Sequence, residues 1–355
     1  MPKWTWIVPV LAIALLGAAL AFGTSPALTT AAAAALMGTV FAAVHHAEVV
    51  AHKLGEPYGA LVLAVAVTVI EASLILSMML AGGPDSAVLA RDTIYAAVMI
   101  ICTGVVGLCL MLGGLRHREQ SFTAEGAGAG LAALIAMCGM TLVLPTFTSS
   151  SPGATYSELQ LEFVAVMSLA LWAVYVFVQT VRHRDYFLPQ SAQADPDEHA
   201  TPPSVALAWA SFGLMVLSLV AVVGLAKTIS PSIERAVAVA GAPKAVIGII
   251  IAILVLLPET LAAVRAARAD RLQTSMNLAL GSALASIGLT IPVVAVASIA
   301  FDLPLVLGLN GKDLVMLVLT FMVSMVTLST GRTHMMLGAI HVVLFMAFLF
   351  LTLVP

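Results

Sequence analysis

Residues 57–81 read PYGALVLAVAVTVIEASLILSMMLA, an apolar run that a single carboxylate interrupts near its centre. A helix of about 20 apolar residues is long enough to cross the ~30 Å hydrocarbon core of a bilayer. Glu71 would then lie near the middle of the membrane, where an ionised carboxylate costs roughly 2.5–3.5 kcal/mol and usually faces a cavity or an ion pathway. The stretch therefore predicts a membrane-spanning helix with a functional carboxylate.

The remainder of the sequence has the same character. Of the 355 residues, 61% are hydrophobic and 9% are charged, whereas a soluble domain carries roughly 45–50% apolar and about 25% charged residues. We expect an all-α integral membrane protein, surrounded by membrane lipid. Apolar runs of spanning length predict about eleven transmembrane helices, at residues 6–22, 27–44, 57–81, 92–113, 126–145, 159–181, 204–226, 243–267, 272–300, 303–327 and 334–354.

The basic residues predict the orientation of these helices. Most of the 15 Lys and Arg residues fall on the side of the N-terminus when the runs are taken to alternate in direction. Short cytoplasmic loops carry an excess of Lys and Arg, so we expect a bacterial inner-membrane protein with a cytoplasmic N-terminus and a periplasmic C-terminus. No basic patch with interleaved aromatic residues indicates nucleic-acid binding, and the sequence predicts no particular oligomeric state.

Two segments that lie five spans apart resemble each other. The residues GEPY at 55–58 precede the helix that carries Glu71, and GAPK at 241–244 precede a helix that carries Glu259. An odd offset means that the two helices enter the membrane from opposite sides. Inverted repeats of this kind are typical of secondary transporters, whose substrate sites lie near the midplane of the membrane.

The second of these helices combines its carboxylate with a proline. Pro258 precedes Glu259, and a proline within a helix leaves a backbone carbonyl one turn earlier without its amide partner. Two carboxylates and freed carbonyls form an all-oxygen site that suits a hard cation such as calcium. Burial favours the protonated carboxyl and a nearby cation favours the ionised one, so protons and cation compete for the same oxygens. This predicts cation/proton exchange, while a structural role for protonated, hydrogen-bonded glutamates stays open.

Polar residues close to the two glutamates are candidates to support such a site, although small and hydroxyl residues also serve as packing devices in membrane helices. The candidates either flank the glutamates or lie on the helix that follows each of them. They are Thr68, Ser73, Thr103, Pro258, Asn277, Ser282 and Ser286.

Histidines gather where the second predicted span gives way to the third. His46 and His52, with Glu56, are candidates for a pH gate or a proton entry path, because histidine titrates near neutral pH. Polar caps at the membrane interface are the alternative. His341, within the last span, is expected to be a packing residue.

At these residues the sequence resembles the calcium/cation antiporter superfamily, in particular its bacterial calcium (or sodium, potassium)/proton antiporter branch. The resembling segments are HAEVVAHKLGEPYG at 46–59, VIEASLI at 69–75, PETLAAV at 258–264 and MNLALGS at 276–282. The resemblance implies an N-terminal helix within 1–26, followed by two inverted five-helix repeats at 27–181 and 204–355, with an acidic cytoplasmic loop at 182–203 between them. It also implies that Glu71 and Glu259 bind the transported cation.

The expected function is therefore a secondary antiporter, with no cofactor, that exports calcium in exchange for protons by alternating access. In the broader superfamily Gly-Asn shortly precedes the acidic residue, whereas Val67-Thr68 and Val255-Leu256 stand here. A sodium or potassium/proton antiporter using the same glutamates stays open. An intramembrane enzyme would need a motif such as G-x-S-x-G or H-E-x-x-H, which the sequence lacks, and a non-transporting subunit would have no need of two symmetric carboxylates.

Overall fold

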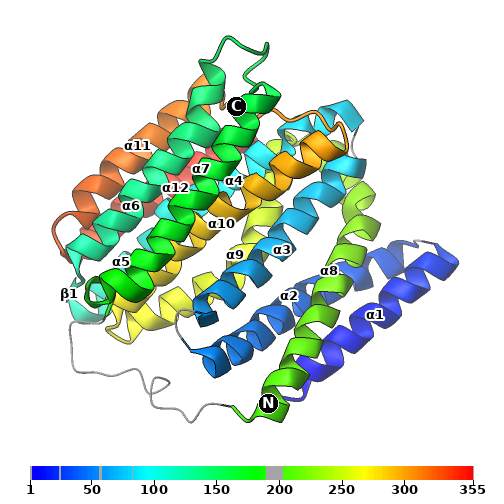
Figure 1. The fold of residues 1–355 in the computed structure, drawn as a ribbon, viewed down its shortest axis with the longest axis horizontal. Helices are drawn as coiled ribbons and strands as arrows, with labels where there is room; N and C mark the ends of the chain where they lie inside the picture. The colour runs from blue at the N-terminus through cyan, green and yellow to red at the C-terminus, as the bar shows by residue number, and fades with distance from the viewer. Residues whose placement is uncertain (1, 24, 56–57, 82, 189–202, 355) are drawn as a thin grey trace. The chain divides into compact units, whose positions relative to one another are not determined.

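The computed structural model of the chain is built almost entirely of helices (Figure 1). It describes residues 2–23, 25–55, 58–81, 83–188 and 203–354. Within these residues eleven helical segments are long and apolar enough to cross a membrane, so the predicted number of spans is confirmed. The segments are Trp4–Phe22, Pro26–Leu54, Leu61–Leu80, Ser86–His117, Ala124–Thr146, Glu158–Arg182, Val205–Val239, Ala245–Arg268, Leu272–Ala300, Gly311–Leu328 and Met335–Leu353.

Several spans contain more than one type of helix, and two short strands lie outside them. The elements are α1 (Trp4–Phe22), α2 (Pro26–Leu54), α3 (Tyr58–Ala81), η1 (Gly83–Val88), α4 (Leu89–Met99), η2 (Ile100–Val105), α5 (Val106–His117), β1 (Glu119–Ser121), α6 (Ala124–Cys138), η3 (Gly139–Val143), η4 (Leu144–Thr146), α7 (Glu158–Phe177), η5 (Val178–Arg182), η6 (Arg184–Tyr186), α8 (Val205–Val239), α9 (Ala245–Arg268), α10 (Leu272–Ala300), α11 (Gly311–Leu328), β2 (Arg332–His334) and α12 (Met335–Leu353). The segments η2, η3 and η5 are π-helical.

The three largest errors in the predicted boundaries arose because the ends of helices depend on capping rather than on hydropathy. The helix α2 extends ten residues past position 44 and stops before Gly55, whose φ of 68° is typical of a glycine that follows a helix. The helix α8 likewise continues to Val239, shortly before Gly241 with its φ of 66°. The helix α11 begins only at Gly311, because the Asn310 side chain caps it by accepting a hydrogen bond from the Asp313 amide at 3.0 Å.

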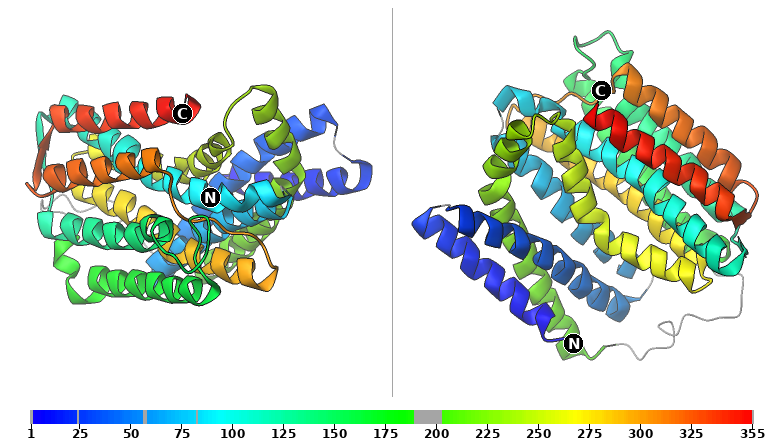
Figure 2. Two further views of the ribbon diagram at one scale, coloured as in Figure 1. Left: turned by 90° about the horizontal axis from the view of Figure 1, so that it is seen from above. Right: turned by 180° about the vertical axis from the view of Figure 1, so that it is seen from behind.

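The first of two compact units comprises Met1–Leu89 and Ala200–Val255. Within it α2 packs against α1, α3 and α8, and the views from front and behind both show α1 beside α2 (Figures 1 and 2). Aliphatic residues such as Leu36, Ile70 and Leu225 form its core. Gly224 allows α8 to approach α1 closely, because a Cβ there would lie 2.3 Å from a methyl carbon of Leu16.

The second unit comprises Ala90–His199 and Leu256–Pro355. Within it α5 packs against α12, and α7 packs against α10. Glycines make both contacts close. A Cβ added to Gly338 of α12 would lie 2.2 Å from the Met111 amide nitrogen, and one added to Gly288 of α10 would lie 2.5 Å from the Trp172 Cβ.

Loops at the ends of the second unit are joined by backbone hydrogen bonds. The antiparallel ribbon of β1 and β2 pairs Glu119 with His334 and joins the loop after α5 to the loop after α11. Elsewhere the segment before α11 is bound to the segment between α6 and α7, since the Gly308 amide donates to the Ala154 carbonyl at 3.0 Å and the Leu309 amide donates to the Leu142 carbonyl at 2.9 Å.

Candidate cation site

Glu71 lies in the middle of α3 and is almost completely buried, with 3% of its surface exposed. Thr68 precedes it by one helical turn, on the same face of the helix. The side chain of Thr68 is 5% exposed, and its hydroxyl has no hydrogen-bond partner within the described part of the chain. Ser73 follows Glu71 by two residues, about 200° round an ideal helix, and is half-buried. Thr68 is therefore better placed than Ser73 to act with Glu71.

Glu259 lies in α9, directly after Pro258, which is inside the helix. The residue is half-buried as a whole, but both oxygens of its carboxyl group are shielded from solvent. The hydroxyl of the next residue, Thr260, donates to the Leu256 carbonyl of the same helix at 2.7 Å. Glu71 belongs to the first unit and Glu259 to the second.

The supporting candidates of the second unit differ in what their polar atoms contact. The Thr103 hydroxyl donates to the Met99 carbonyl of its own span. The Asn277 amide group donates to the Phe187 carbonyl at 2.6 Å and accepts from the Gln273 side chain at 2.9 Å. Asn277 thereby holds the segment after α7 against the start of α10. Ser282 and Ser286 lie one turn apart on α10, the first half-buried and the second 5% exposed.

The histidine candidates occupy different environments on α2. His46 is completely buried, and its Nε2 donates to the Thr5 carbonyl at 2.9 Å, so it holds the start of α1 against α2. His52 is exposed in the last turn of α2. Glu56 lies outside the described residues. The structure therefore assigns His46 a contact between helices that the sequence did not indicate.

A buried polar network around His341 was missed by the sequence analysis. Its Nδ1 donates to the Cys102 carbonyl at 2.8 Å, and its Nε2 lies 2.9 Å from the Thr327 hydroxyl. Cys102 is part of the π-helical segment η2, and π-helical turns inside α-helices occur frequently at functional sites. His341 is thus hydrogen-bonded as well as packed. Its position as a histidine within an apolar run was the one feature of the sequence that could have indicated this network.

A second missed feature fixes the turn between α9 and α10. The Gln120 side chain on β1 donates to the Ala267 carbonyl at 2.9 Å and to the Asp270 carboxylate at 2.8 Å. The Thr123 amide donates to the Gln273 side chain at 2.6 Å. These bonds tie the loop after α5 to the end of the helix that carries Glu259, within the second unit.

The chain was compared with known proteins, and it matches a family. A family model described as sodium/calcium exchanger protein matches residues 24–181 and 210–354. The chain is 47% identical over 359 residues to y4hA of Sinorhizobium fredii (strain NBRC 101917 / NGR234), a proposed ionic transporter, covering 100% of this chain and 97% of that protein. It is 34% identical over 349 residues to the sodium-potassium/proton antiporter ChaA of Escherichia coli (strain K12), covering 97% of this chain and 94% of that protein.

Solved structures share the fold. Native YfkE superimposes with a TM-score of 0.73 at 17% sequence identity, covering 99% of this chain and 100% of that one. The H+/Ca2+ exchanger CAX superimposes with a TM-score of 0.71 at 15% identity, covering 98% of this chain and 89% of that one. At such low identity the similarity is one of fold.

Proposed function

The chain belongs to the sodium/calcium exchanger protein family and is a cation antiporter of the membrane rather than an enzyme, and from this premise we propose that it exports calcium in exchange for protons. Its eleven candidate spans make it a multi-pass membrane protein. We propose Glu71 and Glu259 as the groups that bind the cation, at a site open in turn to each side of the membrane. Cations and protons are the only species that the exchange requires.

The exchange follows from what a buried carboxyl group can bind. Within the membrane the ionised form of the carboxyl group is costly unless a cation is bound to it, whereas the protonated form carries no charge and needs no cation. Calcium takes 6–8 oxygen ligands, of which two glutamates supply at most four. The Thr68 hydroxyl, the carbonyl freed by Pro258, and the α10 hydroxyls of Ser282 and Ser286 are the proposed sources of the others. If the site can change the side to which it is open only when it is protonated or cation-bound, the proton flux and the cation flux are coupled.

The burial of Glu71 is the observation that carries this proposal. The residue is 3% exposed at the centre of a membrane span, one turn from a buried hydroxyl that has no partner among the described residues. The Thr68 hydroxyl is the group beside Glu71 that needs a partner, because a buried hydroxyl without a hydrogen bond costs about 1–3 kcal/mol. A bound cation supplies the missing partner for the hydroxyl and neutralises the carboxylate.

The proposed inverted repeat is supported by the pairing of contacts within the second unit. An offset of five relates the fourth span, which contains α5, to the ninth span, α10, and the sixth span, which contains α7, to the eleventh span, α12. The α5–α12 contact in one repeat order therefore corresponds to the α10–α7 contact in the other. The same offset relates the ribbon of β1 and β2 to the backbone bonds between Gly308 and Ala154 and between Leu309 and Leu142. Matched contacts of this kind are what an inverted repeat would produce.

The proposal is tested by proton movement in inverted membrane vesicles. Addition of calcium should dissipate an imposed proton gradient when the intact protein is present. Glu71→Gln and Glu259→Gln should each reduce the rate to background, because an amide cannot exchange a proton for a cation. Glu162→Gln is the matched control, since Glu162 is an exposed glutamate on the span α7. If Glu71→Gln and Glu259→Gln both keep the calcium-dependent rate of proton movement, in protein that still inserts, the two-glutamate site is overturned.

Sodium and potassium are the second candidate cargo, and the 34% identity to a sodium-potassium/proton antiporter favours testing them. The same vesicles are used with each cation in turn. A response to sodium or potassium with none to calcium would change the cargo and leave the two glutamates as the site. A response that Glu71→Gln abolishes for every cation would indicate one shared site.

We also propose a bacterial inner-membrane location with a cytoplasmic N-terminus. The excess of Lys and Arg on that side supports it, and eleven crossings place the two termini on opposite sides. Alkaline phosphatase fused after the last residue should be active, because the enzyme needs the periplasm, and green fluorescent protein fused there should stay dark. The reverse pattern would invert the proposed topology.

A further inference from the structure

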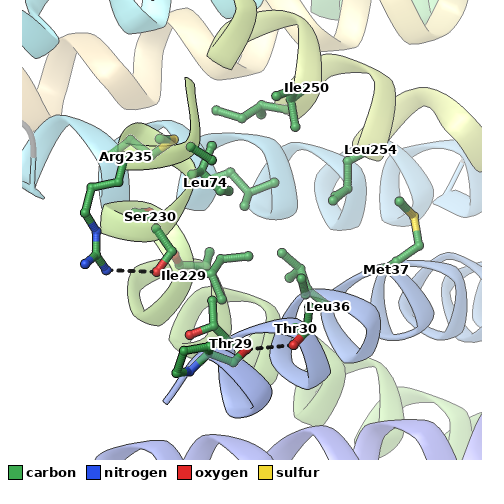
Figure 3. A pocket seen from close by; sticks show the side chains of 18 of the residues that line it. Thr29, Thr30, Leu36, Met37, Leu74, Ile229, Ser230, Arg235, Ile250 and Leu254 are labelled. Carbon is green, nitrogen blue, oxygen red and sulfur yellow. Dashed lines mark hydrogen bonds between the residues drawn. The ribbon is translucent and has the colours of Figure 1, made fainter. Parts of the chain in front are cut away.

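The first unit contains a cavity of about 810 Å³, near the upper end of the roughly 300–1,000 Å³ typical of ligand pockets (Figure 3). Four helices of that unit form its walls. Leu36 comes from α2, Leu74 from α3, Ile229 from α8, and Ile250 and Leu254 from α9. Figure 3 shows these aliphatic side chains on the sides of the space, with Arg235 at one edge.

The walls of this cavity are apolar in their chemistry, even where hydroxyl residues contribute. The Thr29 hydroxyl donates to the Ser25 carbonyl at 3.0 Å, the Thr30 hydroxyl to the Pro26 carbonyl at 2.7 Å, and the Ser230 hydroxyl to the Ala226 carbonyl at 2.8 Å. Each donor is therefore used within its own helix or at its start. A ligand in this space meets mainly methyl and methylene groups.

Arg235 is the one charged residue among the described residues that line the cavity. Its Nε donates to the Pro231 carbonyl at 3.1 Å and one Nη donates to the Ser232 hydroxyl at 3.2 Å. A guanidinium group has five N–H donors, so three remain for a ligand. The two internal bonds fix the group at the edge of the cavity, where it attracts anions and repels cations.

These features do not suit a water-filled path for the transported cation. The described lining residues include no carboxylate, and the charge that is present has the same sign as the cation. The rim includes Ile250 and Val239, which are 40% and 90% exposed, and exposed aliphatic side chains on membrane helices match lipid chains rather than water.

We propose that the cavity binds an acyl chain of an anionic phospholipid, and that Arg235 binds the phosphate of its headgroup. Guanidinium groups bind phosphate through charge-assisted hydrogen bonds, and an apolar space beside a cation matches a molecule that is part hydrocarbon and part anion. The site lies in the first unit alone and does not depend on which cation the protein transports.

Lipid retention tests the proposal directly. The full-length protein is placed in nanodiscs of phosphatidylethanolamine with phosphatidylglycerol, transferred to mild detergent, and the lipids that remain bound are counted by native mass spectrometry. The intact protein should retain one phosphatidylglycerol in preference to phosphatidylethanolamine. Arg235→Gln should lower that retention about tenfold, the scale of one charge-assisted contact. Ala33→Phe, which fills the cavity without changing charge, should lower it as well.

Lys227→Gln is the matched control, because Lys227 is an exposed cation on the same helix that does not line the cavity. Equal losses in Arg235→Gln and Lys227→Gln, or equal retention of the two lipids, would overturn the proposal. A second measurement uses Ala33→Cys and a charged, water-soluble thiol reagent, since the three native cysteines are buried. The new thiol should be protected in nanodiscs with phosphatidylglycerol. Rapid modification would instead indicate a water-filled vestibule.

Discussion

Gly338→Ala is expected to separate α12 from α5. The added Cβ would lie 2.2 Å from the Met111 amide nitrogen, 2.6 Å from its Cα and 2.8 Å from the Gly107 carbonyl oxygen, and all three are backbone atoms that no side-chain rotation can move. Ordinary contact begins near 3.4 Å, so the helices must move apart by roughly 1 Å. Overpacking costs about 1–3 kcal/mol, occasionally more, and three backbone contacts place this substitution at about 3 kcal/mol.

The measurement is the melting temperature of the purified protein in detergent. A loss of about 3 kcal/mol should lower it by roughly 5–10 °C. Gly281→Ala is the matched control, because a Cβ there meets nothing within 4 Å and alanine favours a helix over glycine by about 1 kcal/mol. It should leave the melting temperature unchanged or raise it slightly. Equal melting temperatures for the two variants would refute the close approach of α5 and α12.

Three further predictions concern polar groups within the spans. Thr68→Val should weaken cation binding while leaving the melting temperature unchanged or raised, because it removes a buried hydroxyl that has no partner among the described residues. The half-saturating cation concentration and the melting temperature are measured on one preparation. A higher half-saturating concentration without a lower melting temperature is expected, and a parallel loss of both would contradict the prediction. His341→Phe should lower the melting temperature, since it leaves the Cys102 carbonyl buried without its donor at a cost of about 1–3 kcal/mol, and an unchanged melting temperature would contradict the hydrogen bond. The apparent cation affinity should rise with pH, by up to about tenfold per pH unit for each proton displaced, because cation binding requires the ionised carboxylate; a flat profile would argue against competition for Glu71 and Glu259.

The number of spans could be predicted from the sequence because the hydrophobic effect acts on composition, and composition is visible in the sequence. For the same reason Glu71 and Glu259 lie within candidate membrane helices, as predicted. The end of α2 and the start of α11 were not predicted, because Gly55 and the Asn310 cap determine where these helices end and begin. Backbone conformation and capping are local properties that a hydropathy pattern does not contain.

The family was also predicted from the sequence and is confirmed. The roles of individual residues were harder to predict, because they depend on contacts between distant segments. Asn277 looks like a ligand in the sequence, yet its amide bonds to Gln273 and to Phe187, 90 residues away. His341 looks like a packing residue, yet it bonds to Cys102 across 239 residues. The two glutamates as a shared site stay a prediction.

Hydroxyl groups within the spans suggest a way to separate structural from functional polar residues in such a protein. Many of them donate a hydrogen bond to a carbonyl four residues earlier, as Thr103, Thr141 and Ser218 do, and are thereby satisfied as donors within their own helix. Such a residue fits among apolar neighbours without a partner from another helix. Thr68 departs from this pattern one turn from a buried carboxylate. A buried hydroxyl that its own helix leaves without a hydrogen bond costs stability, so the effects of Thr68→Val on stability and on cation binding separate a structural role of this residue from a functional one.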